Sequence, residues 1–165
     1  MDESSNLIKQ LNLSPHPEGG FFKELYRSTI RMTPGQLPYG YKSERRLATS
    51  IYYLLVKYQY SKFHRIRSDE LWYFHKGSSL KIYEIDKEGN KHLHFLGINI
   101  DKGEKPQVLI PAGNVFAAEL MDKDTFGLFG CMVSPGFDYA DFELFEENDL
   151  SNTYPEHSEL FQKFC

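Results

Sequence analysis

A histidine and a glutamate six residues apart, His64 and Glu70, are the side chains in this sequence best placed to do chemistry. They lie in a tract rich in aromatic residues, FHRIRSDELWYFHKG, residues 63–77. With the period of two of a β-strand, Glu70 shares one face with Trp72 and Phe74. A carboxylate on an apolar wall is costly unless a cation, a hydrogen-bond donor or a ligand meets it. We therefore expect the functional site in this tract.

The pair has two interpretations. Inside a pocket, an imidazole near a carboxylate is a natural general base, because the carboxylate orients the ring and favours its charged form. The alternative is a buried hydrogen bond between His64 and Glu70 that stabilises the fold without doing chemistry.

The segment His16-Pro17-Glu18-Gly19-Gly20 is the second candidate, because it is too constrained to be a linker. Pro17 fixes its own backbone and biases His16 toward an extended conformation. The two glycines permit a positive φ or the close approach of another chain segment. The segment is either a turn that docks the N-terminal region across the domain or onto a second subunit, or one that points His16 and Glu18 into a pocket.

The elements around these residues are mostly strands. Turn signals recur at intervals of roughly ten residues after Leu47, which is typical of an all-β sandwich or barrel. We expect residues 71–77 and 79–86 to pair across Gly77. Residues 4–11 are predicted to form a short helix capped by Ser4 or Ser5. The other predicted strands are 21–30, 47–58, 91–100, 106–113, 114–121, 125–136 and 137–145, followed by two short helices split by Pro155.

Composition narrows the class of protein. The 165 residues form one domain, 1–165, with 19 basic and 23 acidic side chains and a net charge of −4, which argues against a nucleic-acid partner. No apolar run reaches the roughly 20 residues of a membrane span, and the N-terminal stretch lacks the features of a signal peptide. Cys131 and Cys165 are expected to be free thiols. The expected location is the cytoplasm.

Two motifs resemble those of the cupin superfamily. The tract from His64 through Ile66 and Glu70 to Gly77 resembles the first cupin motif, and residues 111–116, PAGNVF, resemble the second. Ile66 and Phe116 stand where metal-binding cupins carry histidines. The segments LNLSPHPEGGFFKELYRS, FHRIRSDELWYFHKG and CMVSPGFDYADFEL further resemble one single-domain branch of the superfamily that has an HPEGG signature near its N-terminus and no settled biochemical role.

The resemblance implies a cupin-type jelly-roll β-barrel with a short N-terminal helix, short C-terminal helices and a pocket in the barrel mouth, in a protein that is usually dimeric. It also implies a likeness of shape to metal-free sugar-nucleotide epimerases. We therefore predict an isomerase or epimerase for a small polar, sugar-like or nucleotide-sugar ligand, in which His64 is the base, Glu70 orients it and a tyrosine is the acid. The candidates for this acid are Tyr52, the preferred one, and Tyr26. Predicted ligand-binding residues are His16, Glu18, Tyr26, Trp72, Gln107, Phe116 and Glu119.

Two other functions stay open. One is a non-catalytic module that binds or senses a small molecule. The other is a metal-dependent cupin enzyme with a reduced ligand set, in which His64 and Glu70 hold a divalent ion. Protein metal sites usually need three or four ligands and matching positions supply two, so no cofactor is expected. The expected partners are a small-molecule ligand and a second copy of the chain.

Overall fold

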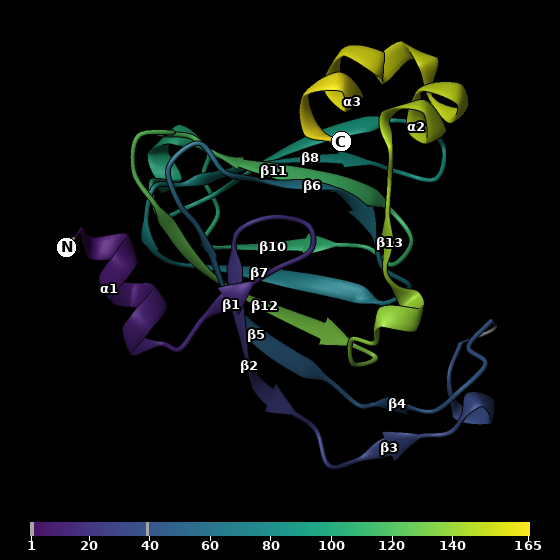
Figure 1. Ribbon diagram of the computed structural model, residues 1–165. Helices are drawn as coiled ribbons and strands as arrows, with labels where there is room; N and C mark the ends of the chain where they lie inside the picture. The colour runs from purple at the N-terminus through teal and green to yellow at the C-terminus, as the bar shows by residue number, and fades with distance from the viewer. Residues whose placement is uncertain (1, 39) are drawn as a thin grey trace.

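The computed structural model describes residues 2–38 and 40–165, and over these residues antiparallel strands form two facing sheets (Figure 1). In spatial order, the six-stranded sheet contains β1 (Ser14–Pro15), β2 (Phe21–Arg27), β5 (Thr49–Leu55), β12 (Gly127–Ser134), β7 (Asp69–Gly77) and β10 (Gln107–Ile110). The five-stranded sheet contains β13 (Glu143–Leu144), β6 (Tyr60–Arg65), β11 (Val115–Leu120), β8 (Leu80–Ile85) and β9 (Lys91–Leu96). The predicted all-β, cupin-type fold is confirmed.

Short elements complete the chain. β3 (Arg31–Met32) and β4 (Arg45–Arg46) form a separate two-stranded ribbon. The α-helices are α1 (Glu3–Gln10), α2 (Glu147–Thr153) and α3 (Ser158–Phe164), and the 3₁₀ turns are η1 (Pro34–Gln36), η2 (Ile100–Lys102), η3 (Tyr139–Asp141) and η4 (Pro155–His157). No helix among the described residues is long and apolar enough to cross a membrane.

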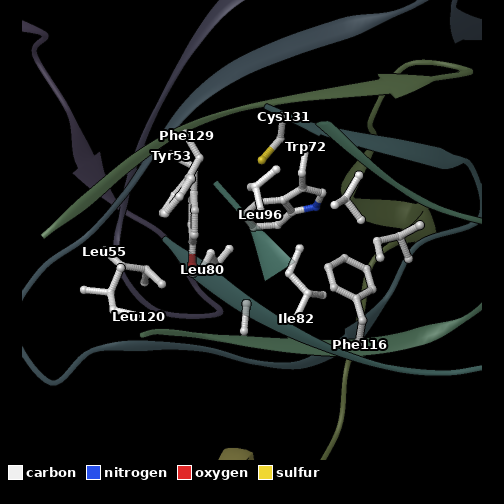
Figure 2. Close-up of a cluster of buried hydrophobic side chains, with 13 residues drawn as sticks. Tyr53, Leu55, Trp72, Leu80, Ile82, Leu96, Phe116, Leu120, Phe129 and Cys131 are labelled. Atoms are coloured by element: carbon white, nitrogen blue, oxygen red, sulfur yellow. The ribbon is translucent and has the colours of Figure 1, made fainter. Parts of the chain in front are cut away.

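The main core fills the space between the two sheets. Trp72, which is 1% exposed, packs there with Tyr53 and Phe129 from the same sheet and with Ile82 and Phe116 from the other (Figure 2). These side chains alternate with outward-facing ones along their strands, as the period of two requires. Burial of their apolar surface is the dominant stabilising contribution to such a sandwich.

The C-terminal helices cover the outer face of the five-stranded sheet (Figure 1). Phe161 and Phe164 of α3 are fully buried and pack on Phe63 of β6 and on Ala117 of β11. Because this second layer covers it, every residue of β11 is buried. The prediction of two short helices split at Pro155 is confirmed.

Helix α1 begins one residue earlier than predicted, with a different cap. The side chain of Asp2 accepts a hydrogen bond of 2.8 Å from the backbone N–H of Ser5, so Asp2 and neither predicted serine is the N-cap. Leu7 and Ile8 pack with Leu54 on the outer face of the six-stranded sheet.

The largest difference from the sequence prediction concerns the tract 63–77. His64 lies on β6 and Glu70 on β7, and these strands belong to opposite sheets. The chain bends between them at residues 66–68, where Tyr41 and Ser68 share a hydrogen bond of 2.8 Å between their hydroxyls. The order of residues within one tract does not show which strand each half of it pairs with, so the sequence does not reveal this bend.

The predicted hairpin of residues 71–77 and 79–86 is wrong for a related reason. β7 pairs with β12 and β10, whereas β8 pairs with β11 and β9. Gly77 therefore turns the chain from one sheet to the other. It has a φ of +91°, and a Cβ at this position would lie 2.2 Å from the carbonyl oxygen of Phe126, so the crossing requires glycine.

The predicted strand 137–145 is also wrong over most of its length. The segment forms the 3₁₀ turn η3 and the two-residue strand β13 instead. Asp138 begins η3, because its carboxylate accepts a hydrogen bond from the N–H of Ala140. The buried pair between Arg45 and Asp141, 2.6 Å from Nε to Oδ2, fixes this loop beside the barrel.

Candidate functional site

A cavity of about 240 Å³ lies between the two sheets. Strands β2, β5, β7 and β12 form one side, β6 contributes from the other, and the turn 16–20 and the loop 137–142 complete the wall. Thr49, Ile51 and Tyr53 line it from alternate positions of β5, as expected for one face of a strand. Its other polar or titratable lining residues are His16, Glu18, Glu24, Arg27, His64, Glu70, Cys131, Asp138 and Tyr139.

The turn 16–20 carries Glu18 into the interior. The carbonyl of Glu18 accepts a hydrogen bond of 2.8 Å from the N–H of Lys62, and the Tyr53 hydroxyl donates one of 2.8 Å to the carbonyl of Gly19. Gly19 has a φ of +116°, and a Cβ there would lie 2.2 Å from the carbonyl oxygen of Tyr60. The backbone of the turn thus lies directly on β6, which no other residue type at position 19 would allow.

Glu18 is the carboxylate that contacts His64. Nε2 of His64 lies 3.1 Å from Oε2 of Glu18, and the other carboxylate oxygen accepts a bond of 2.9 Å from the Ser61 hydroxyl. Both members of the pair are buried. The imidazole ring also lies 4.1 Å, centroid to centroid, from the ring of Phe116, which restricts its orientation.

One hydrogen bond fixes the tautomer of His64. Nδ1 of His64 is 2.7 Å from the carbonyl oxygen of Lys62, and since a carbonyl only accepts, Nδ1 carries a hydrogen. The other ring nitrogen, Nε2, faces Oε2 of Glu18 at 3.1 Å. An imidazole and a carboxylate in contact inside a cavity are groups that acid–base catalysis can use.

Glu70 approaches the same cavity from β7 in a different protonation state. Burial, together with the negative charge of Glu18, raises the pKa of Glu70 to about 8. Burial and the two nearby carboxyl groups also raise the pKa of the Cys131 thiol well above its usual value. At neutral pH the cavity thus presents Glu70 as a neutral acid beside the ionisable pair of Glu18 and His64. A cavity that raises the pKa of a carboxyl group in this way is typical of acid–base sites.

The raised pKa of Glu70 predicts a pH dependence of stability. Between the ordinary pKa of a glutamate, 4.5, and about 8, folded Glu70 keeps a proton that the unfolded chain releases, so stability falls as pH rises through this window. Glu70→Gln removes the titrating group. Its free energy of unfolding relative to wild type should therefore increase with pH, at no more than about 1.4 kcal/mol per pH unit.

Urea denaturation of both proteins at several pH values measures this difference. Glu88→Gln, which changes an exposed glutamate at a hairpin tip, is the control and should give a difference that is flat with pH. A flat difference for Glu70→Gln as well would show that Glu70 ionises normally in the folded protein.

His16 contributes a neutral imidazole to the wall. Its Nδ1 accepts a hydrogen bond of 3.3 Å from the N–H of Glu18, so Nε2 carries the hydrogen. Burial lowers the pKa of His16, which favours the neutral ring. The ring packs edge-on against Phe22, Tyr53 and Phe142 at centroid distances of 4.7, 5.9 and 6.2 Å. His16 is thus a fixed N–H donor beside aromatic surfaces.

Two charged residues line the cavity from β2. Arg27 donates from Nε and Nη2 to the two carboxylate oxygens of Glu24, at 2.9 and 2.6 Å. Both side chains are partly exposed, so the pair lies toward solvent. The register of β2 against β5 shifts between Glu24 and Tyr26, and this bulge places Glu24 and Arg27 on the same wall.

Four predicted site residues meet in this cavity: His16, Glu18, His64 and Glu70. Their grouping differs from the prediction, because Glu18, and not Glu70, bonds to His64. Trp72 and Phe116 lie in the core between the sheets, where Trp72 fills the interior and Phe116 packs beneath the imidazole of His64. Neither of these two rings lines the cavity.

The other predicted residues lie on different surfaces. Tyr52 faces away from the cavity and contacts the ring of His75, while its neighbour Tyr53 faces inward. Tyr26 follows the bulge in β2 and is 52% exposed. Gln107 is exposed on the edge strand β10.

Glu119 is buried on the opposite face of the five-stranded sheet. There it bonds to the Tyr83 hydroxyl at 2.9 Å and to Lys163 of α3 at 2.8 Å, so it ties the C-terminal helix to the sheet. Its placement follows from strand alternation, since Phe116 and Ala118 face the inner core. This role is structural, in a position that the sequence had suggested for a ligand contact.

Sequence reasoning missed several residues of the site. Ser61 bonds to Glu18, Cys131 lies beside Glu70, and Tyr53 and Phe142 border His16. The available signal was the alternation in TSIYYLL, where Thr49, Ile51 and Tyr53 share a face. Pairing of the turn 16–20 with β6 joins segments more than 40 residues apart, as the bond between Ser61 and Glu18 shows, and no local pattern reports it.

Two facing antiparallel sheets around a cavity that holds imidazole and carboxyl groups define a cupin-type barrel protein. The sequence matches the family described as "Cupin superfamily (DUF985)" over residues 5–145, and the chain belongs to this family.

Solved structures and a curated relative resemble the whole chain. Protein SO0799 from Shewanella oneidensis is 42% identical with a TM-score of 0.89, covering 100% of this chain and 98% of its own. A hypothetical protein from Leishmania major is 31% identical with a TM-score of 0.89, covering 99% of each chain. The uncharacterized protein YML079W of Saccharomyces cerevisiae is 28% identical over 152 residues, 87% of this chain and 75% of its own length. These names carry no activity, so function must be argued from the site.

Metal binding, which is frequent in the cupin superfamily, was tested against the residues of this site. Ile66 and Phe116 offer no metal-ligating atoms, and both nitrogens of His64 are engaged by Glu18 and by the Lys62 carbonyl. Within residues 2–38 and 40–165, no three His, Cys, Asp or Glu side chains are arranged to hold a metal ion. The residues present do not fit a divalent ion, and the chemistry proposed below uses the chain's own groups.

Proposed function

We propose that the cavity binds a small polar, sugar-like molecule and transfers a proton on it, as an isomerase or epimerase does. The observation that carries this proposal is the contact of 3.1 Å between Nε2 of His64 and Oε2 of Glu18, next to the neutral carboxyl of Glu70, inside one cavity. Aromatic rings at Phe22 and Phe142 give such a ligand an apolar wall.

Glu18, His64 and Glu70 have different roles in this reaction. A C–H bond next to a substrate carbonyl breaks, and its proton passes to the carboxylate of Glu18, which His64 holds in place. The electron pair of that bond forms a C=C bond, and the carbonyl oxygen becomes an enolate. The O–H of Glu70 donates to this oxygen and stabilises its developing charge. Return of the proton to a different atom or face completes the isomerisation.

This assignment revises the roles expected from the sequence. Glu18 takes the place of Glu70 as the partner of the base, and Glu70 takes the place of Tyr52 as the acid. Tyr53, the neighbour of Tyr52 on the cavity side of β5, donates its hydrogen to the carbonyl of Gly19 and so holds the turn 16–20.

A non-catalytic binding protein is the second candidate. Both oxygens of Glu18 and both nitrogens of His64 are already engaged within the protein. Such a fully bonded pair also suits a rigid binding wall that never exchanges its proton.

Solvent exchange separates the two functions. The protein is incubated in D₂O with aldoses, ketoses and nucleotide sugars, and nuclear magnetic resonance measures deuterium at the carbon next to the carbonyl. The isomerase proposal expects exchange in proportion to protein concentration with at least one compound. Ile51→Trp, which places a larger side chain on the cavity wall, is the control and should abolish it. Saturable binding without exchange would favour the binding protein. The absence of both binding and exchange would contradict both functions.

A further inference from the structure

The cation that reaches the cavity from β2 is paired with a carboxylate. Arg27 uses Nε and Nη2 on Glu24, and its Nη1 lies 3.5 Å from the carbonyl oxygen of Phe137. Sites that recognise phosphate or carboxylate groups present an arginine fork or a lysine with donors available to the ligand. Glu24 neutralises Arg27 and occupies the fork formed by its Nε and Nη2.

The other nitrogen-bearing side chains of the wall supply no free positive charge either. The imidazole of His64 is held between Glu18 and the Lys62 carbonyl. His16 is neutral, because burial lowers its pKa. Asp138 adds a further carboxylate to the same wall. The groups left to meet a ligand are neutral donors, among them the Nε2–H of His16, the carboxyl of Glu70 and the hydroxyl of Tyr139.

We infer that the cavity selects an uncharged ring bearing hydroxyl or carbonyl groups and excludes phosphate and carboxylate groups, with Glu24 as the residue that sets this selectivity. The inference rests on the proposed function in that the ligand enters this cavity. An anion placed here would lose its hydration and meet carboxylates without gaining a free cation, which is unfavourable. A nucleotide sugar could place only its sugar ring inside, with its phosphates outside the wall.

Matched probes test the selectivity. Glucose and fructose are each compared with their 6-phosphates, and binding is measured by saturation-transfer nuclear magnetic resonance and calorimetry. For wild type we expect saturable binding of at least one free sugar and binding of its phosphate at least about tenfold weaker. Equal or tighter binding of the phosphate, or no saturable binding of either free sugar, would overturn the inference.

Glu24→Gln tests the role of the residue itself. Without the carboxylate, the guanidinium of Arg27 becomes available, so the preference for the free sugar should shrink at least about threefold and phosphate binding should strengthen. Glu143→Gln is a matched control, because Glu143 pairs with Arg65 away from this cavity and its loss changes the net charge equally. An equal change of preference in both variants would show that it comes from net charge alone, and would overturn the assignment of Glu24.

The outcome is independent of whether the protein is an isomerase. Binding of a free sugar without deuterium exchange would refute proton transfer and leave the selectivity intact. Faster exchange into a sugar phosphate than into the free sugar would refute the selectivity and support proton transfer.

Discussion

Glu18→Gln should slow deuterium exchange into a bound sugar by roughly 10²- to 10⁴-fold, the usual contribution of a positioned acid–base group. The amide has nearly the same shape and can still accept the hydrogen bond from Ser61, but it cannot take up a proton. The turn 16–20 should stay in place, since its backbone bonds to Lys62 and Tyr53 are untouched. Sugar affinity, measured by calorimetry, should therefore change far less than the exchange rate.

Two further variants make this result specific. His64→Ala should also slow exchange strongly, because it removes the imidazole that contacts the carboxylate of Glu18 and holds it in place. Tyr52→Phe should leave exchange unchanged, since Tyr52 contacts His75 on the outer face of the sheet. Wild-type exchange rates in both Glu18→Gln and His64→Ala would sink the assignment of the pair as the proton-transfer group.

The fold was accessible from the sequence because its signals are local. Turn residues recur between alternating strands, and motifs such as residues 111–116 lie at the ends of strands. The failures occurred where a local pattern continues through a change of partner. The tract 63–77 carries the spacing of a single motif, yet it crosses from one sheet to the other at residues 66–68.

Residues of the candidate site could be predicted from the sequence, but the contacts between them could not. His16, Glu18, His64 and Glu70 could be named from residue type and motif spacing. The bond from Glu18 to His64 depends on where a turn docks, which is a tertiary contact. Which of the adjacent residues Tyr52 and Tyr53 faces the cavity depends on the register of β5. Because both residues are tyrosines, their types do not indicate that register.

Bulges and covering layers explain the remaining differences. One extra residue in β2 places Tyr26 in solvent and Glu24 with Arg27 on the cavity wall. Helix α3 covers the outer face of β11 and buries Glu119 far from the cavity, so burial alone does not identify a ligand contact. Both effects arise from long-range packing and leave no mark on residue spacing.

Trp72→Ala should lower the free energy of unfolding by about 3–5 kcal/mol, the typical cost of truncating a large buried aromatic residue. Trp72 is 1% exposed and lies between the rings of Tyr53 at 5.4 Å and of Phe116 and Phe129 at 6.2 Å each (Figure 2). Removing it leaves a cavity in the centre of the sandwich that the surrounding strands can close only in part. Urea denaturation followed by circular dichroism measures the loss, since the variant lacks the chain's single tryptophan.

Trp72→Phe is the informative companion, because it separates a core role from a ligand role. Among the described residues the indole N–H has no hydrogen-bond partner, so phenylalanine loses ring volume but no bond. Its loss of stability should be clearly smaller than that of the alanine variant, and its affinity for a free sugar should match wild type. Sugar binding that fails in a folded Trp72→Phe protein would return Trp72 to the ligand-contacting wall. Unchanged binding would assign it to the core that supports the cavity.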